Sequence, residues 1–165
     1  MVDWPAKNPR ALSRQLSALL LTLLVIGLSA CAADQATGKV GEPLRAGDYE
    51  LTITNIDGHA SSPDRFTNAK PGNVLVKADF VMNNKGGLHL PVWASYFTLH
   101  DSGGSDNSVR TDVTGDQYLT KQRDVPPGGT TQGTVYFEMA ANERPQSVVF
   151  APALVGWRTR IAVQP

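Results

Sequence analysis

Thiol chemistry is almost absent from this 165-residue chain, because Cys31 is its only cysteine. A single cysteine excludes an internal disulfide and a Cys-x-x-Cys pair for redox chemistry or zinc binding. Histidine is also scarce: His59, His89 and His100 are the only three, and no two of them have a His-x-His or His-x-x-x-His spacing. Ligand spacings of that kind are typical of zinc sites. We therefore expect no metal site and no cofactor.

The chain also lacks an excess of charge of either sign, since 15 Lys and Arg residues balance 15 Asp and Glu residues. The basic residues are scattered singly and form no stripe that would neutralise phosphates, so we expect no nucleic-acid partner. The chain contains no Gly-x-Ser-x-Gly motif and no phosphate-binding glycine loop ahead of a helix. We expect that the protein is not an enzyme.

The run DSGGSDN, residues 101–107, is rich in oxygen ligands of the kind that calcium prefers. The run lacks the downstream glutamate of the helix-loop-helix calcium motif. A hairpin turn is the simpler interpretation.

One long uncharged run is present, and it lies near the start of the chain. Lys7, Arg10 and Arg14 precede it, and residues 15–33 contain no charged side chain. A positive start followed by an apolar centre is typical of a secretory signal peptide. The run is also about long enough for an uncleaved membrane helix, which remains an alternative.

The end of this run, Leu28-Ser29-Ala30-Cys31, resembles the bacterial lipobox, at which a signal peptidase cuts before the cysteine. The resemblance implies a signal peptide over residues 1–30, recognised through Leu28, Ser29 and Ala30, and a diacylglyceryl group on Cys31. Two or three acyl chains bind a membrane firmly, at roughly 0.8 kcal/mol for each buried methylene. Ordinary secretion is the other alternative, although Leu28 is too bulky for that cleavage. We expect a lipid anchor on the extracytoplasmic face of the cell membrane.

Small and polar residues follow the cysteine, in the sequence AADQATGKVGE of residues 32–42. This composition predicts a flexible tether, so that the lipidated cysteine and tether occupy residues 31–42 and the folded domain occupies residues 43–165. The chain has 15 glycines and 11 prolines and few segments with helical spacing, which indicates short strands joined by turns.

Apolar residues in the domain alternate with polar ones, as in YELTITNI, where Tyr49, Leu51 and Ile53 share one face. The predicted strands are 49–56, 73–84, 96–101, 108–113, 130–139, 146–152 and 159–163. Turn-forming clusters such as KPGN at residues 70–73 separate them. The pattern predicts an all-β fold, an immunoglobulin-like antiparallel sandwich whose two sheets cover each other's apolar faces.

The runs PGNVLVKADFVMNNKGG, FTLHDSGG, PPGGTTQGTVYFEM and SVVFAP occur in this order. Together they resemble a bacterial family of secreted and lipid-anchored, telokin-like immunoglobulin-like domains of unknown function, over most of residues 41–163. The mycobacterial immunoprotective extracellular protein shares that fold. The resemblance implies a fold and an extracytoplasmic location, and it brings no catalytic residues.

Two segments are candidates for a binding surface. The first contains His89, Trp93 and Tyr96, for which burial in the core is favoured but exposure would create a contact patch. The second contains Phe66, which stands alone among polar residues. We expect a non-enzymatic interaction module that contacts an envelope protein through loops of the sandwich. A carrier of a small solute, lipid or metal ion is the alternative, and an envelope hydrolase lacks its motif.

Overall fold

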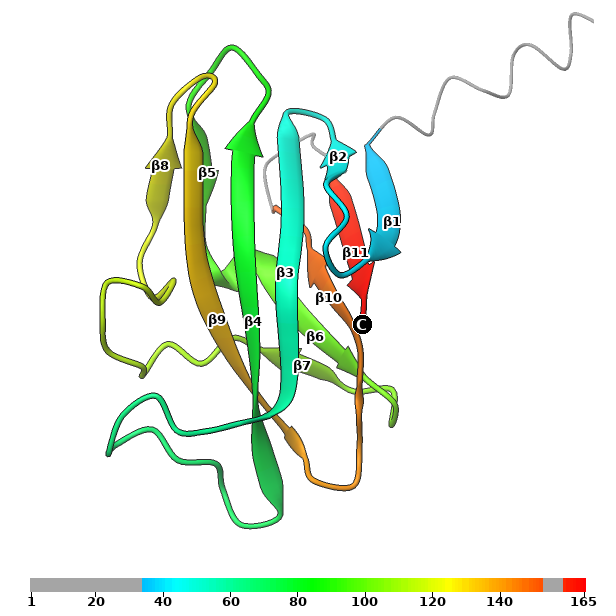
Figure 1. Ribbon diagram of the computed structural model, residues 1–165, viewed down its shortest axis with the longest axis vertical. Coiled ribbons are helices and arrows are strands. Elements are labelled where there is room, and N and C mark those ends of the chain that lie inside the picture. Colours follow the sequence, from blue (N-terminus) through cyan, green and yellow to red (C-terminus); the bar gives the residue numbers. More distant parts are fainter. Residues whose placement is uncertain (1–33, 153–158) are drawn as a thin grey trace, which may run out of the picture. The chain divides into compact units, whose positions relative to one another are not determined.

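The computed structural model describes residues 34–152 and 159–165, and these are nearly all strand or loop (Figure 1). The strands are β1 (Gln35–Lys39), β2 (Leu44–Ala46), β3 (Tyr49–Ala60), β4 (Asn73–Asn84), β5 (Leu90–Val92), β6 (Phe97–Asp101), β7 (Asp106–Ser108), β8 (Arg123–Val125), β9 (Thr130–Ala140), β10 (Pro145–Phe150) and β11 (Arg160–Gln164). The helical content of this part of the chain is one 3₁₀ turn, η1 (Ala94–Tyr96). The predicted all-β fold is confirmed.

The strands form two main sheets and a small third one. The first sheet has the order β1-β11-β10-β6-β7, the second β2-β3-β4-β9, and the third pairs β5 with β8. Neighbouring strands are antiparallel except for β1 and β11, which are parallel. The two main sheets stack (Figure 1), as expected for a sandwich.

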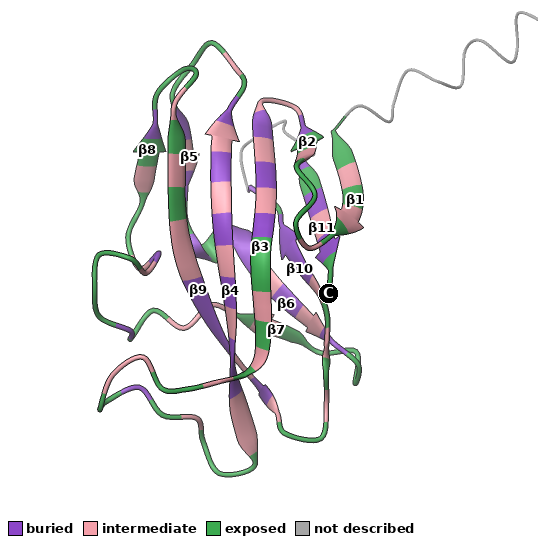
Figure 2. Ribbon diagram, in the orientation of Figure 1, coloured by how far each residue is buried: buried purple, intermediate pink, exposed green. Residues whose placement is uncertain are grey.

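Alternation along the long strands supplies the core between the sheets (Figure 2). Tyr49, Leu51 and Ile53 are completely buried, as predicted. The ring of Phe150 lies at the centre, with its centroid 5.0 Å from that of Phe97 and 5.1 Å from that of Tyr49. Since the described residues contain no cysteine, packing and hydrogen bonding hold these sheets together.

The prediction of a flexible tether up to residue 42 is wrong, because Gln35–Lys39 form strand β1. This strand pairs in register with Arg160–Gln164 of β11. A Cβ atom at Gly38 would lie 2.7 Å from Leu44 Cδ2, so a larger residue here would require the Leu44 side chain to shift. Backbone pairing stabilises β1 without an apolar alternation. The ordered domain therefore begins about eight residues earlier than Pro43, close to Asp34.

Strands β6 and β7 form the hairpin that was expected at DSGGSDN. Asp101, which is buried, accepts hydrogen bonds from the amides of Gly103 (3.1 Å) and Ser105 (2.9 Å) and from Asn107 Nδ2 (2.8 Å). These bonds use the carboxylate to hold the turn.

The long strands give the sandwich two opposite ends. At the first, the Asp34 end, the Arg160 amide donates to Asp34 O (2.8 Å) and the Lys85 amide donates to Asp48 O (2.8 Å). The first bond joins the start of β1 to the start of β11, and the second joins the β2–β3 turn to the β4–β5 loop; these segments lie at the same end of the sandwich (Figure 1, top). Strands of 12 residues run from there for roughly 40 Å.

The opposite end, the Phe66 end, contains the β3–β4 loop and the β6–β7 and β9–β10 turns (Figure 1, bottom). The Ala141 amide donates to Gly72 O (2.9 Å), and the Ser102 amide donates to Arg144 O (2.9 Å). The two ends of the sandwich thus present different sets of loops.

Candidate interaction site

The β3–β4 loop, residues 61–72, presents an exposed aromatic ring. Phe66 is 73% exposed, the highest fraction among the large hydrophobic residues described. The guanidinium carbon of Arg65 lies 4.6 Å from the centroid of the Phe66 ring, which is a cation–π contact. Aromatic and arginine side chains are enriched at protein interfaces. The tip of the loop has the composition of a contact point.

Asp64 fixes the backbone on which Phe66 is presented. Its Oδ1 atom accepts hydrogen bonds from the amides of Phe66 (2.8 Å) and Thr67 (2.7 Å), and its Oδ2 atom accepts one from Thr114 Oγ1 (3.1 Å). The bond from the Phe66 amide contributes most to lowering the pKa of Asp64, which falls to about 2. Thr67 is completely buried and donates its hydroxyl to Asp112 O (3.4 Å). The loop is therefore held on both sides of the exposed ring.

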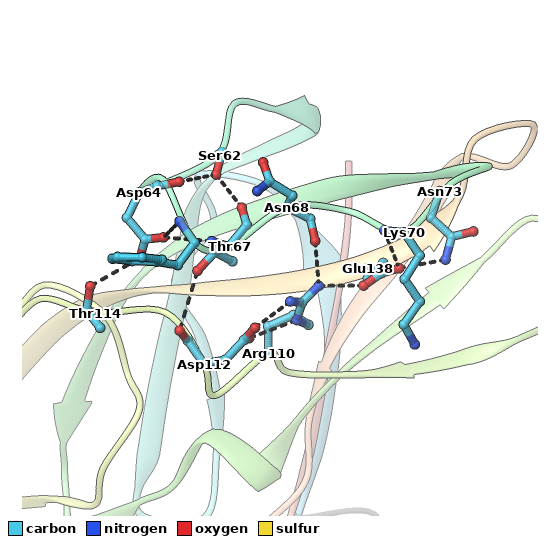
Figure 3. Close-up of polar contacts among 11 residues, drawn as sticks. Ser62, Asp64, Thr67, Asn68, Lys70, Asn73, Arg110, Asp112, Thr114 and Glu138 are labelled. Atoms are coloured by element: carbon cyan, nitrogen blue, oxygen red, sulfur yellow. Dashed lines mark hydrogen bonds and ion pairs between the residues drawn. The ribbon is translucent and has the colours of Figure 1, made fainter.

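Arg110 connects this loop to the sheet below it (Figure 3). Its Nε atom donates to Asp112 Oδ1 (2.8 Å), and its Nη1 atom donates to Glu138 of strand β9 and to Asn68 O. A guanidinium can do this because its five N–H groups point in fixed directions. Arg110 thereby joins three segments that are distant in the sequence.

Glu138 receives donors from the loop as well as from Arg110. Its Oε1 atom accepts hydrogen bonds from the Lys70 amide (3.0 Å) and from Asn73 Nδ2 (2.7 Å). Burial alone would raise the pKa of Glu138, but the donors from Asn73 and Lys70 and the charge of Arg110 together hold that pKa below its usual value. The carboxylate is stable in its charged form at the base of the loop.

A small second core lies under the same loop, on the outward face of the four-stranded sheet. Leu75, Val113 and Tyr136 are buried there, and Ala69 of the loop packs against them. Tyr118 meets Tyr136 edge to face, with ring centroids 5.5 Å apart. Apolar packing therefore adds to the polar network in holding the loop.

Hollows on the described surface have linings that mix polar and apolar residues. One of about 480 Å³ lies on the outward face of the four-stranded sheet and is lined by residues that include Thr54, Asp79, Gln132 and Thr134. Another, of about 340 Å³, lies beside the loop and includes Ser62 and Asn68. Phe80 and Val81 also line the first hollow, and Val74 and Leu75 the second, so the linings do not indicate one class of ligand.

The first predicted surface does not form as a unit. Leu90 and Val92 of β5 point into the core, so Trp93 is directed outward and is 42% exposed, whereas burial was favoured. Tyr96 is buried, with its ring 5.9 Å from that of Phe150, and it is not a surface residue. His89 is exposed and pairs with Asp124, at 2.6 Å between Nδ1 and Oδ2.

Three residues that organise the loop, Asp64, Arg110 and Glu138, were not predicted. The Ser-Pro-Asp sequence at residues 62–64 is a turn signal that points to the first of them. The other two are separated by 28 residues, and no local pattern links them.

Cys31 and the lipobox residues Leu28, Ser29 and Ala30 lie outside the described residues. Among residues 34–152 and 159–165, no helix has the length and hydropathy needed to cross a bilayer. In the same part of the chain, no three His, Cys, Asp or Glu side chains are grouped so that they could hold a metal ion.

Fold and loop together define a single β-sandwich domain with a fixed, exposed aromatic loop at one end. The chain belongs to a family of domains of unknown function, DUF4352, which it matches over residues 38–159. The expected β-sandwich family of unknown function is thereby confirmed. Comparison with proteins of curated function gives no match.

Solved structures from three bacterial proteins share the fold. The secreted protein MPT63 of Mycobacterium tuberculosis has a TM-score of 0.62 and 17% identity, over 81% of this chain and 100% of MPT63. The yjhA protein of Bacillus subtilis has a TM-score of 0.56 and 14% identity, over 77% of this chain and 98% of its own. The ycdA protein of the same organism, a candidate lipoprotein, has a TM-score of 0.58 and 14% identity, over 73% of this chain and 38% of its own.

Proposed function

We propose that this protein is a lipoprotein, anchored through Cys31 on the extracytoplasmic face of the cell membrane. We propose further that its sandwich is a non-enzymatic module that binds an envelope protein through the loop containing Phe66. The lipobox sequence from Leu28 to Cys31 supports the anchor. The secreted and candidate-lipoprotein neighbours share the fold and are in keeping with this location.

One observation carries the binding role: Phe66 is 73% exposed on a loop whose backbone is already fixed by hydrogen bonds. A preformed loop loses little conformational entropy when it binds, so more of the contact energy appears as affinity. Exposed aromatic anchors that enter a pocket on the partner commonly dominate binding.

The chemistry of the tip defines the complementary surface. Burial of the Phe66 ring requires an apolar pocket, and the charge of Arg65 beside it requires carboxylates or carbonyl oxygens at the rim of that pocket. The expected partner is a protein that has an apolar pocket with an acidic border.

Crosslinking in the native envelope tests the binding role. A photoreactive amino acid at position 66 is expected to give a discrete protein adduct, and the same amino acid at exposed Lys121 is the control. Replacing Phe66 by Ala, with the photoreactive amino acid placed at Arg65, is expected to remove the adduct. Equal adducts at positions 66 and 121, or none at all, would contradict the proposal. A small molecule that co-purifies at fixed stoichiometry would favour a carrier instead.

Metabolic labelling with a palmitate analogue tests the anchor. Cys31→Ser is expected to abolish labelling and to move the protein out of the membrane fraction. Labelling that persists in this variant would refute the assignment of Cys31.

A further inference from the structure

We infer that the sandwich stands on the bilayer with its Asp34 end at the lipid headgroups and Leu88 in contact with lipid. The Phe66 loop then points away from the membrane. This inference rests on the anchor at Cys31 under the proposed function. It goes further by assigning a lipid-contacting surface and an orientation to the domain.

The first argument is the length of chain between the anchor and the fold. Asp34 is already tied to the domain, because its carbonyl accepts the Arg160 amide at 2.8 Å. Only Ala32 and Ala33 separate Asp34 from Cys31. Three fully extended residue steps span at most about 11 Å. The Asp34 end therefore cannot move more than this distance from the lipid-bearing residue.

That distance is comparable to the thickness of the headgroup layer. A bilayer whose hydrocarbon core is about 30 Å thick measures about 40–45 Å with its headgroups, which leaves roughly 5–8 Å on each side. A diacylglyceryl group has its glycerol at the boundary between these layers. Asp34 is consequently held at or just above the headgroups, together with the loops that surround it.

The second argument is an exposed apolar side chain on that same end. Leu88 lies in the β4–β5 loop and is 72% exposed. The buried Asn84 side chain fixes this loop by donating to Leu88 O (2.7 Å) and to Val125 O (2.9 Å) and by accepting the Gly86 amide (2.8 Å). Leu88 is thus presented to the membrane side as firmly as Phe66 is presented on the opposite side.

Contacts between the loops place Leu88 and Asp34 at one end. The Lys85 amide bonds to Asp48 O, and Asp34 Oδ1 lies 3.7 Å from the position of a Cβ atom at Gly47. The β2–β3 turn therefore lies next to both the start of β1 and the loop that carries Leu88, and all three are at the top of Figure 1.

The charges described at this end do not explain its inferred contact with the bilayer. The four charged residues joined by these contacts are Asp34, Asp48, Lys85 and Arg160, two of each sign. These four charges supply no polybasic attraction to anionic lipid. The short connection and Leu88 set the orientation of the domain on the bilayer. The orientation is therefore expected to be insensitive to salt and to the content of anionic lipid.

Fluorescence quenching on the full, processed chain tests the orientation. Acylation blocks the only native thiol, so L88C or F66C supplies a single thiol for an environment-sensitive fluorophore. The labelled protein is reconstituted in phosphatidylcholine vesicles that contain phosphatidylcholine with a nitroxide near the top of its acyl chain. Quenching is expected to be severalfold stronger at position 88 than at position 66. Equal quenching, or stronger quenching at position 66, would overturn the inference.

A longer connection provides the matched control for the label itself. A Gly/Ser insertion of about twelve residues between Ala33 and Asp34 has a root-mean-square length of roughly 20 Å. It is expected to reduce quenching at position 88 while palmitate labelling stays unchanged. Quenching that is equally strong with the insertion would show that the short connection does not set the orientation.

The palmitate signal separates the two proposals. A protein that carries the analogue but shows no quenching at position 88 would refute the orientation alone. A protein that lacks the analogue and leaves the membrane would refute the anchor, and the orientation with it.

Discussion

The ion pair between Arg110 and Glu138 is the contact at which the polar network of the β3–β4 loop can be tested quantitatively. Its side chains are 22% and 10% exposed, so solvent screens this pair less than an ordinary surface pair. Replacing Arg110 by Met keeps an unbranched apolar stem and removes the guanidinium donors. Glu138 then retains the Lys70 amide and Asn73 Nδ2 as partners.

The magnitude follows from these remaining partners. A hydrogen bond to a charged group contributes about 1.5–3 kcal/mol, and Glu138 loses one such bond rather than all of its partners. We expect Arg110→Met to lower the free energy of unfolding by about 2–3 kcal/mol, since the bonds to Asp112 and Asn68 are lost as well. Glu138→Gln is expected to cost about 1–2 kcal/mol.

A double-mutant cycle isolates the pair. Urea unfolding of a soluble form beginning at Ala32 is expected to give a coupling energy of about 1–2 kcal/mol between the two substitutions. The control cycle uses Lys85 and Glu50, at 3.0 Å but 41% and 22% exposed, where coupling below about 0.5 kcal/mol is expected. Coupling at the Arg110 pair no larger than in this control would refute the argument that Arg110 holds the loop.

Three further predictions concern the core, the acid response and the β4–β5 loop. Phe150→Ala is expected to cost about 3–5 kcal/mol and Trp93→Ala less than about 1 kcal/mol in urea unfolding, because only the first ring is fully buried. The pKa of Asp64 is about 2 in the folded chain, below its unfolded value, so its stabilising effect is complete above about pH 4 and is lost as pH falls towards 2. An NMR titration of the Asp64 carboxyl carbon with a midpoint near pH 4 would contradict this. Asn84→Ala leaves three backbone partners without the Asn84 side chain and is expected to cost about 2–3 kcal/mol, and a loss below about 0.5 kcal/mol would show that water replaces the side chain.

The long strands were predictable because their pattern is complete within each segment. The predicted strand at residues 73–84 coincides with β4, and its alternation places Val76, Phe80 and Met82 in the core. Short strands give too few residues for a period to be recognised. Strands β1, β2, β5 and β8, of five, three, three and three residues, were therefore missed.

The candidate site was predictable only in part. Phe66 was identified because an isolated aromatic residue among polar residues can be recognised in the amino-acid sequence alone. The residues that fix it were not, since Asp64 and Thr114 are 50 residues apart and meet only through the fold. The predicted strand at residues 108–113 fails for the same reason: β7 ends at Ser108, and Arg110 turns to reach Glu138.

The length of the β3–β4 loop is itself an argument that it has a role beyond connection. Strands β3 and β4 are antiparallel neighbours, paired as far as Ala60 and Leu75, and a two-residue turn can join such strands. The chain instead uses the 12 residues 61–72 between them. Ordering these residues costs conformational entropy, which the bonds of Asp64, Arg110 and Glu138 offset. A loop that only connects two strands does not need these bonds, whereas the fixed presentation of an exposed ring requires them. Long ordered loops in compact domains are commonly functional.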